Sequence, residues 1–230
     1  MNPIFTAQIA DACIRLKVPF RVAPHGIHPV FPVTSMLSGV ALPVRHVGSV
    51  DVFLEALEIA GASAAGRIMV IDNAARTDEA CIGDLVSLEC KLAGVTAIVL
   101  NGLNRDCDDI AKVGLPVYSY GSCPTGPQRL DPRPSDAFTT AHFASFTVTA
   151  DDTVFADTDG VIFVETGHVA EVTALAGQVR EKELKQTVLA NSGTGLREQF
   201  KFTAFLAARA TDPSLTFRQH LAALAKSIEE

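Results

Sequence analysis

The chain has 230 residues, which is enough for one large domain, or for one domain with a helical appendage, and for an ample hydrophobic core. Its formal net charge of -7 and its pI of about 5.3 offer no broad positive surface to nucleic acid. Hydrophobic residues make up 48% of the chain, yet no uninterrupted apolar run approaches the roughly 20 residues that a membrane-spanning helix needs. The N-terminus shows no basic leader followed by an apolar block, so we expect a cytoplasmic protein that binds neither nucleic acid nor membrane.

The five cysteines are odd in number and show neither CxxC spacing nor a pattern of histidine partners. We therefore expect reduced thiols with mostly structural roles, and no zinc site. Cys107 lies beside the acidic cluster described below. It is either a reactive thiol or, as we favour, a small filler at a helix start.

The first 38 residues predict one short helix followed by irregular extended chain. The apolar spacing of residues 6–18 predicts a helix that has Thr6 as its N-cap and one apolar side, formed by Ile9, Ala12, Cys13 and Leu16. Pro19 ends this helix. The prolines that alternate with Val and Phe in residues 19–38 favour extended chain over the surface.

A strand and a helix are predicted next. Residues 39–46 have strand character, but Pro43 then requires an edge position or a bulge. Residues 49–59 predict a helix with Ser49 at its N-cap, and the side chains that we expect to face inward are Val52, Ala56 and Ile59.

The middle of the chain alternates between strand and helix. Residues 67–72 predict a short buried strand, and the loop that follows, 73–83, contains almost no core residues and is a candidate for substrate contact. A helix begins at Gly83 and is closed by Gly94, and one apolar face of it is formed by Leu85, Leu88 and Leu92. Residues 95–100 are a short apolar run of strand length, which Asn101-Gly102 ends.

The last part of the sequence changes from strands to helices. A short strand is expected at 116–120, and a long loop rich in Pro, Gly and Arg at 121–134. A meander of short strands is predicted at 143–150, 153–156 and 161–164, separated by Asp-rich turns. Helical segments with mixed charge begin near residue 169. We therefore expect a principal domain over residues 1–168 and a helical extension over 169–230 that packs on it.

Four charged residues flank the helix and the strand in the middle of the chain: Asp84, Arg105, Asp106 and Asp109. Each acid taken alone has an ordinary explanation. Asp84 and Asp106 suit helix N-caps, and Asp109 suits the favourable field of a first helical turn. Polar groups at a helix start and just beyond the carboxyl end of a strand also build small-molecule sites in α/β proteins.

Taken together, the same residues suit a site for a metal and an anion. Asp106 and Asp109 fall on one face of a helix start and supply hard oxygen ligands, which suit Mg²⁺ or Mn²⁺. Asp84 is placed to orient a metal-bound water, and Arg105 supplies a fixed cation for an anion. After Gly83, the N–H groups of Leu85 and Val86 are free to hold a carboxylate.

These residues also carry a resemblance to a known family. Asp84, twenty residues, Arg105-Asp106, two residues and Asp109 fit the signature D-x20-R-D-x2-(E/D) of the class II pyruvate aldolases. That family contains 4-hydroxy-4-methyl-2-oxoglutarate and 4-carboxy-4-hydroxy-2-oxoadipate aldolases together with the regulator of RNase E activity A. The segments GVTAIVLNGLNRD, TAQIADA, GIHPV and VFADTDGVIFVE stand in the expected order, so the resemblance runs from about residue 5 to 165.

The resemblance implies an α/β fold of the swivelling type, a β/β/α sandwich, here with additional C-terminal helices. It also implies a homotrimer or homohexamer with active sites between subunits. By position, Asp106 is the direct metal ligand, while Asp84 and Asp109 hold metal-bound waters. Arg105 contacts the 2-keto oxygen, and the N–H groups of Leu85 and Val86 bind the pyruvyl carboxylate beside Gly83.

The expected function is therefore that of a lyase that depends on Mg²⁺ or Mn²⁺, cleaves a 4-hydroxy-2-oxo acid to pyruvate and decarboxylates oxaloacetate. The alternative from the same resemblance is a non-catalytic regulator of an RNase E-type ribonuclease. A methyltransferase has no support, because no Gly-rich loop opens a helix with an acidic residue about 20 positions later. Arg76 is a candidate for the distal carboxylate of the substrate, an exposed arginine being the ordinary alternative.

Overall fold

The structure is a computed structural model that describes residues 2–143 and 145–229. The chain divides into two compact units, residues 1–177 and 178–230. In the described part of the chain, no helix has both the length and the apolar character needed to cross a membrane. Whether the second unit packs on the first remains a prediction.

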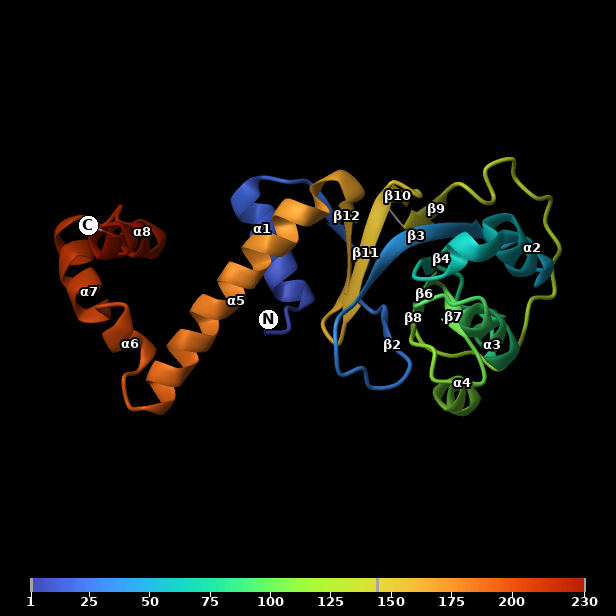
Figure 1. Cartoon of the computed structure of the whole chain (residues 1–230), viewed down its shortest axis with the longest axis horizontal. Coiled ribbons are helices and arrows are strands. Elements are labelled where there is room, and N and C mark those ends of the chain that lie inside the picture. Colours follow the sequence, from blue (N-terminus) through green and yellow to red (C-terminus); the bar gives the residue numbers. More distant parts are fainter. Residues whose placement is uncertain (1, 144, 230) are drawn as a thin grey trace. The chain divides into compact units, whose positions relative to one another are not determined.

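The first unit is built on one mixed sheet of eight strands (Figure 1). Their order is β1-β12-β11-β3-β4-β6-β8-β2. The central pairs β3–β4, β4–β6 and β6–β8 are parallel, whereas the flanking pairs are antiparallel. The bounds are β1 Phe20–Val22, β2 His28–Pro29, β3 Leu37–Arg45, β4 Ile68–Asp72, β6 Ala97–Asn101, β8 Val117–Ser119, β11 Asp152–Asp157 and β12 Gly160–Glu165.

Two small two-stranded sheets complete the β structure. They pair β5 (Ala80–Ile82) with β7 (Leu103–Asn104) and β9 (Ala141–Phe143) with β10 (Phe146–Val148). The helices of the first unit are α1 (Thr6–Leu16), α2 (Asp51–Ala60), α3 (Asp84–Leu92) and α4 (Cys107–Val113), with short 3-10 turns at Gly61–Ala64 and Thr166–His168. Helix α5 (Val169–Asn191) begins in the first unit and continues into the second.

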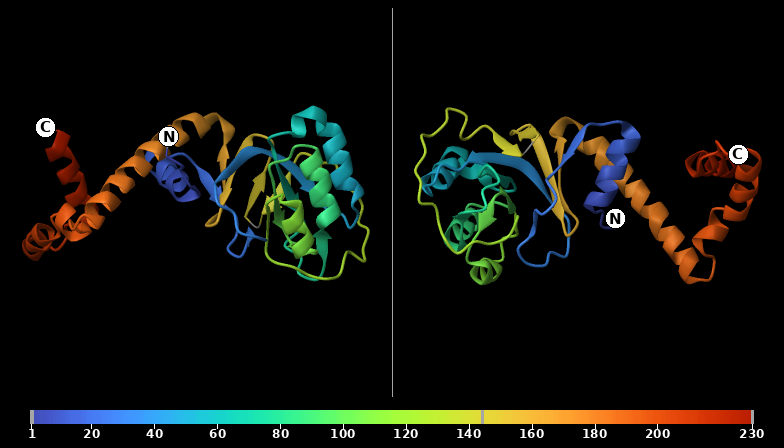
Figure 2. Two further views of the ribbon diagram at one scale, coloured as in Figure 1. Left: turned by 60° about the horizontal axis from the view of Figure 1, so that its bottom comes forward. Right: turned by 180° about the vertical axis from the view of Figure 1, so that it is seen from behind.

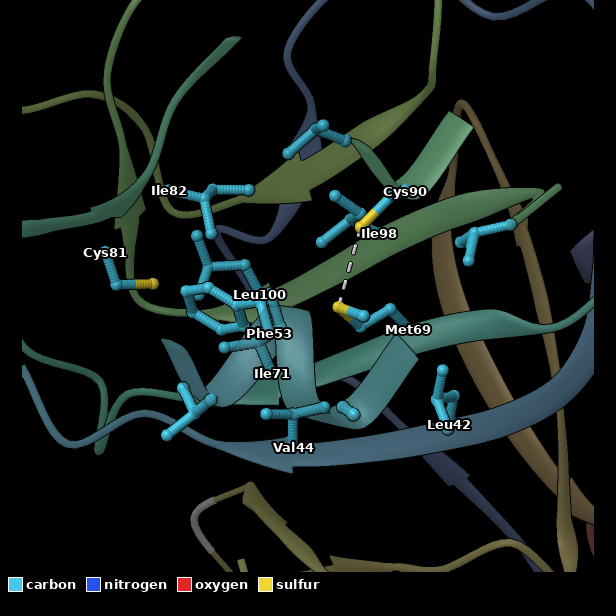
Figure 3. Close-up of a cluster of buried hydrophobic side chains, with 14 of the residues drawn as sticks. Leu42, Val44, Phe53, Met69, Ile71, Cys81, Ile82, Cys90, Ile98 and Leu100 are labelled. Atoms are coloured by element: carbon cyan, nitrogen blue, oxygen red, sulfur yellow. Dashed lines mark hydrogen bonds between the residues drawn. The ribbon is translucent and has the colours of Figure 1, made fainter. Parts of the chain in front are cut away.

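The central strands are buried on both faces, which explains their continuous apolar sequences. Alternate side chains of β4 and β6 point to opposite faces of the sheet. Met69, Ile71, Ile98 and Leu100 pack against α2 and α3 (Figure 3), whereas Ile68, Val70, Ala97 and Val99 pack against the β9–β10 hairpin. Figure 2 shows α2 and α3 side by side on their face of the sheet. The layers are therefore hairpin, sheet and helices, and the expected swivelling-type β/β/α fold with added C-terminal helices is confirmed.

A third cluster of buried residues lies on the antiparallel side of the sheet. There α1 and the first two turns of α5 pack on β11 and β12, and the contacts are made by Ile9, Ala12, Cys13, Phe155, Ile162, Val164, Val172 and Ala176. The edge position expected for Pro43 is confirmed. Strand β3 pairs with β11 only from Leu37 to Val40, and from Ala41 to Arg45 it pairs with β4 alone.

Both predicted N-caps were wrong. The cap residue of α1 is Phe5, whose N–H donates to Gln8 Oε1 at 2.9 Å. Thr6 instead binds Asp157, with its hydroxyl 2.7 Å from Oδ1 and its N–H 2.7 Å from Oδ2. Helix α2 begins at Asp51 with Val50 as its cap residue. The hydroxyl of Ser49 is hydrogen bonded to the Asp51 carboxylate instead, which lowers the pKa of that carboxyl group.

Three predicted apolar faces also need correction. Leu16 and Ile59 are exposed, and α2 buries Phe53 in place of Ile59. The leucines of α3 point outward, with exposed fractions of 74%, 40% and 74% for Leu85, Leu88 and Leu92. This helix buries Ser87 and Cys90 instead, and burial raises the pKa of the Cys90 thiol to about 12.

Two further segments differ from the sequence prediction. The loop 73–83 ends in the fully buried strand β5, which pairs with β7. The single strand expected at 143–150 is replaced by the β9–β10 hairpin, and Ala144 lies outside the described residues.

The second unit is helical, as expected. After α5 come α6 (Leu196–Gln199), α7 (Phe202–Thr211) and α8 (Phe217–Glu229). Helices α6 and α7 are separate elements, because Lys201 between them has a left-handed backbone with φ +46°. Phe205 is the buried centre of this unit and contacts the rings of Phe202, Phe217 and His220.

The hydrogen bonds of Thr6 to Asp157 give the first testable prediction. Thr6→Val removes a buried bond to a charged acceptor and should lower the free energy of unfolding by about 1–2 kcal/mol. Urea denaturation measures this change. Thr77→Val, at an exposed position, is the control and should stay within about 0.5 kcal/mol of the unchanged protein. Equal losses in the two variants would contradict a specific role for the Thr6 hydroxyl.

Candidate functional site

A cavity of about 390 Å³ lies at the start of α3. Five of the residues predicted from the sequence line it: Gly83, Asp84, Leu85, Val86 and Arg105. The other lining residues follow β3, begin α2, form β5 or belong to the long loop; they are His46, Gly48, Ser49, Val50, Ala80, Cys81, Ile82, Gly126 and Pro127. The fold thus brings together segments that are far apart in the sequence.

Asp106 stands at the N-cap position of α4, but its side chain makes no capping hydrogen bond. Its backbone is left-handed, with φ +58° and ψ +42°. Such a conformation is uncommon for residues other than glycine and is found preferentially at functional sites. The carboxylate instead faces the start of α3, where Oδ2 lies 3.3 Å from Arg105 Nε. The simple capping explanation for Asp106 therefore fails.

Gly83 is required for this arrangement because of space. Its own backbone angles, φ -142° and ψ -158°, suit any residue. A Cβ atom at this position, however, would lie 2.3 Å from Asp106 Oδ2 and 3.3 Å from Arg105 Cγ. The missing side chain makes the gap into which the Asp106 carboxylate fits.

The start of α3 offers free N–H groups to the cavity. Gly83 is the cap residue and Asp84 is the first helical residue, so the N-cap explanation for Asp84 is wrong. The first intrahelical bond runs from the N–H of Ser87 to the Gly83 carbonyl at 3.1 Å. The N–H groups of Leu85 and Val86 precede it and have no intrahelical acceptor, and they suit an anion at the positive end of the helix.

Arg105 is fixed through its backbone and leaves its side chain half exposed. Its N–H donates to the Ile82 carbonyl at 3.0 Å, which ties the segment before α4 to β5. Its side chain is 50% exposed. A planar guanidinium group at the cavity wall, beside free helix N–H groups, suits a small anion with several oxygen acceptors.

Asp109 lies in the first turn of α4, and its carboxylate pairs with Lys112 Nζ at 2.6 Å. Among the described residues, no group of three or more His, Cys, Asp or Glu side chains is arranged to hold a metal ion. The resemblance implies one direct ligand, Asp106, with the other acids acting through water. The uncapped Asp106 carboxylate and the gap at Gly83 fit that role, since Mg²⁺ prefers hard oxygen ligands and retains several waters.

The sequence did not point to a buried polar network behind the cavity. His46 Nδ1 lies 2.9 Å from Asn73 Oδ1, which also accepts from Arg129 Nη2 at 2.9 Å. The same Arg129 group donates to Glu79 Oε1 at 2.8 Å. The sequence did hold a signal, because His46 is the last residue of the strand predicted at 39–46 and Asn73 directly follows the strand predicted at 67–72. The carboxyl ends of neighbouring parallel strands meet at one edge, and Arg45 is indeed paired with Asp72.

A second cavity, of about 290 Å³, adjoins this network and shares His46 with the first. Arg76, the candidate for a distal carboxylate, lines this second cavity, where its guanidinium group pairs with Asp78 and Glu79.

The fold is that of an α/β protein, and the candidate small-molecule site lies at a helix start, beside an arginine and close to an uncapped aspartate. The family model RraA-like, described as Aldolase/RraA, matches residues 6–163 of this chain. The chain therefore belongs to the RraA-like family.

Relatives in sequence are distant. An uncharacterized protein of Methanocaldococcus jannaschii is 28% identical over 116 residues, which are 50% of this chain and 55% of that protein, so the match spans about half the length of each. A protein of Xanthomonas campestris pv. campestris (strain 8004), named "Putative 4-hydroxy-4-methyl-2-oxoglutarate aldolase", is 24% identical over 133 residues, which are 58% of this chain and 79% of that protein. The name of the Xanthomonas relative is that of a lyase.

Solved structures support the fold. An uncharacterized protein from Pseudomonas syringae pv. tomato matches with a TM-score of 0.70 at 22% identity, covering 85% of this chain and 92% of that one. Streptomyces coelicolor RraAS2, described as an unusual member of the RNase ES inhibitor RraA protein family, matches with a TM-score of 0.64 at 20% identity, covering 80% and 90%.

Two partners of Arg129 make a matched pair of stability tests. The Glu79 side chain is 4% exposed, whereas that of Asp131 is 54% exposed. Glu79→Gln removes the buried negative charge that faces the Arg129 guanidinium group and should lower the free energy of unfolding by about 3 kcal/mol. Asp131→Asn should cost about 1 kcal/mol or less, because solvent screens an exposed pair. Equal losses in the free energy of unfolding of the two variants, measured by chemical denaturation, would contradict the importance of burial.

Proposed function

We propose that this protein is a divalent-metal-dependent lyase that cleaves 4-hydroxy-2-oxo acids to pyruvate and also decarboxylates oxaloacetate. The observation that carries the proposal is the seating of the uncapped Asp106 carboxylate against Gly83, which itself lines the cavity together with Arg105 and the start of α3. The family and the name of the Xanthomonas relative support a lyase.

The cavity suits the pyruvyl end of such a substrate. The carboxylate accepts from the N–H groups of Leu85 and Val86, where the helix favours negative charge. The 2-oxo oxygen accepts from the Arg105 guanidinium group, whose planar donors fix its direction. At about 390 Å³, the cavity lies within the usual range for small-molecule sites, roughly 300–1,000 Å³.

Both reactions require stabilisation of the same negative charge. Breaking the C3–C4 bond of a 4-hydroxy-2-oxo acid, or losing CO2 from oxaloacetate, leaves pyruvate enolate. Arg105 stabilises the enolate oxygen because its donors are already oriented when the charge develops. Asp106 would hold the metal directly, with Asp84 and Asp109 binding its waters. A bound Mg²⁺ or Mn²⁺ supplies Lewis-acid stabilisation of that oxygen.

We also propose that the chain assembles as a homotrimer or homohexamer with the site between subunits. The leucines of α3 support this proposal, because Leu85, Leu88 and Leu92 form an exposed apolar stripe on the helix that begins at the cavity. Sedimentation velocity measures the assembly, and a monomer at micromolar concentration would contradict it.

A regulator of an RNase E-type ribonuclease is the second candidate function. It is favoured by the likeness in fold to Streptomyces coelicolor RraAS2. The uncapped Asp106 has no evident use in such a regulator, so we rank the regulatory function second. Binding to an RNase E-type enzyme in a pull-down, together with no lyase activity, would reverse this order.

The direct test of function is pyruvate release from oxaloacetate and from 4-hydroxy-4-methyl-2-oxoglutarate, each with Mg²⁺ and again after chelation. We expect release from both substrates that is lost on chelation and restored by Mg²⁺. If neither substrate released pyruvate, the proposal would be contradicted.

Substitutions at the charged residues test their individual roles. Asp106→Ala should abolish turnover while the far-UV circular dichroism remains that of the folded protein. Arg105→Lys should lower kcat by about 100-fold or more, because an ammonium group cannot reproduce the planar donor geometry. Asp108→Ala is the matched control, an exposed acid in the same helical turn, and should keep its activity. A fully active Asp106→Ala protein would remove the metal role from that residue.

Gly83→Ala tests the gap that admits Asp106. The added methyl group displaces the carboxylate, so the affinity for Mg²⁺, measured by isothermal titration calorimetry, should fall by about tenfold or more. Gly167→Ala is the control, since a Cβ at that position meets no atom within 4 Å. Unchanged Mg²⁺ affinity in Gly83→Ala would show that the gap does not position a metal ligand.

A further inference from the structure

His46 occupies a position that the mechanism above leaves unused. It directly follows β3 and lines both the cavity that contains Arg105 and the neighbouring one. Its N–H donates to the Asp72 carbonyl at 2.9 Å, and its ring stacks on Phe53 with a centroid distance of 5.4 Å and an interplanar angle of 10°. The side chain is 1% exposed, so the ring is held rigidly at the cavity wall.

The hydrogen bonds of the ring fix its tautomer. His46 Nδ1 lies 2.9 Å from the Oδ1 atom of Asn73, and that atom also faces Arg129 Nη2 at 2.9 Å. A guanidinium group only donates, so the amide atom that faces it is the oxygen. Nδ1 must therefore donate to Asn73, and in the neutral ring the lone pair is on Nε2.

The surroundings keep the ring neutral. Burial is the main cause that lowers the pKa of His46, and the positive charge of Arg129 lowers it further. The hydrogen bond to Asn73 and the negative charges of Glu79 and Asp131 act in the opposite direction without reversing the shift. Arg45 and Asp72, which line the neighbouring cavity, neutralise each other as a pair at 3.5 Å. A neutral imidazole is the form that accepts a proton.

We propose that His46 Nε2 is the proton acceptor for the 4-hydroxyl group of the substrate. This inference rests on the proposed function. Nε2 takes the hydroxyl proton, the oxygen electron pair forms the new carbonyl group, and the C3–C4 bond breaks with its electrons moving into the enolate. The imidazolium then returns the proton to C3, which gives pyruvate and regenerates neutral His46. Asn73 is a positioning residue that sets the tautomer, and Arg129 and Glu79 hold Asn73 in place.

The two proposed reactions differ in their need for this step. Oxaloacetate carries no 4-hydroxyl group, loss of CO2 leaves the enolate without removal of a proton, and solvent water then protonates C3 to give pyruvate. His46 is therefore required for carbon–carbon cleavage of hydroxy acids and not for decarboxylation. A purely structural role would lower both activities together.

The test compares both activities in His46→Gln. With Mg²⁺ present, cleavage of 4-hydroxy-4-methyl-2-oxoglutarate should fall by about 100-fold or more in kcat, while most of the oxaloacetate decarboxylation is retained. His168→Gln, the same substitution at an exposed histidine, is the control and should change neither activity. Equal losses of both activities, or no loss of cleavage, would overturn the assignment.

Asn73→Asp gives a second readout that does not depend on the folding of His46→Gln. The Nδ2 atom of Asn73 is buried and makes no hydrogen bond. The replacement by Asp therefore loses no hydrogen bond, and it adds a negative charge beside Nδ1 of His46. The charge raises the pKa of His46, so the acid limb of the pH profile of kcat for cleavage should move to higher pH. The corresponding limb for decarboxylation should stay in place. An unmoved cleavage limb would overturn the proposal.

Pyruvate release by the wild-type protein distinguishes failure of this inference from failure of the proposed function. No pyruvate from either substrate means that the proposed function fails, and the role of His46 fails with it. Decarboxylation without hydroxy-acid cleavage would overturn the role of His46 while leaving a metal-dependent lyase.

Discussion

The close approach of the Asp106 carboxylate to the backbone of Gly83 is the constraint on which the rest of the site depends. The carboxylate fits there because position 83 has no side chain and because Asp106 adopts a left-handed backbone. The second condition carries a cost, because the left-handed backbone of Asp106 is strained and its side chain gives up the cap of α4. The arrangement leaves a carboxylate that caps no helix close to the free N–H groups of α3, which suits the binding of a metal and an anion.

The sheet explains how distant segments reach this point. Parallel pairing of β3, β4 and β6 brings their carboxyl ends to one edge, where His46 and Asn73 follow two neighbouring strands. The β5–β7 pair then ties the start of α3 to the segment that contains Arg105. Two elements of the site are thus fixed independently, a donor-rich wall at α3 and a buried polar network behind it. In our account the wall at α3 binds the pyruvyl end of the substrate, and the polar network holds His46, which accepts the proton of the 4-hydroxyl group.

Local chemistry made much of this fold predictable. The all-apolar runs of β4 and β6 and the acids that frame them identified the central strands and the Asp84–Arg105 neighbourhood. Features that depend on tertiary contacts were missed. Thr6 binds a carboxylate 151 residues away in place of its own helix, and the leucine stripe of α3 faces outward because Ser87 and Cys90 fit the close packing against the sheet. His46 gave no signal by itself, since its partners are separated in sequence and converge only through strand register.

The measurement that tests the central claim most directly is hydrogen exchange of the pyruvate methyl group in D2O, followed by proton NMR. Cleavage of a 4-hydroxy-2-oxo acid and decarboxylation of oxaloacetate both pass through pyruvate enolate, so the test does not depend on which acid is the natural substrate. A site that stabilises this enolate should accelerate exchange in the presence of Mg²⁺ well above the rate with Mg²⁺ alone. It should lose this acceleration in Asp106→Ala. Exchange no faster than the background with metal alone would contradict the account.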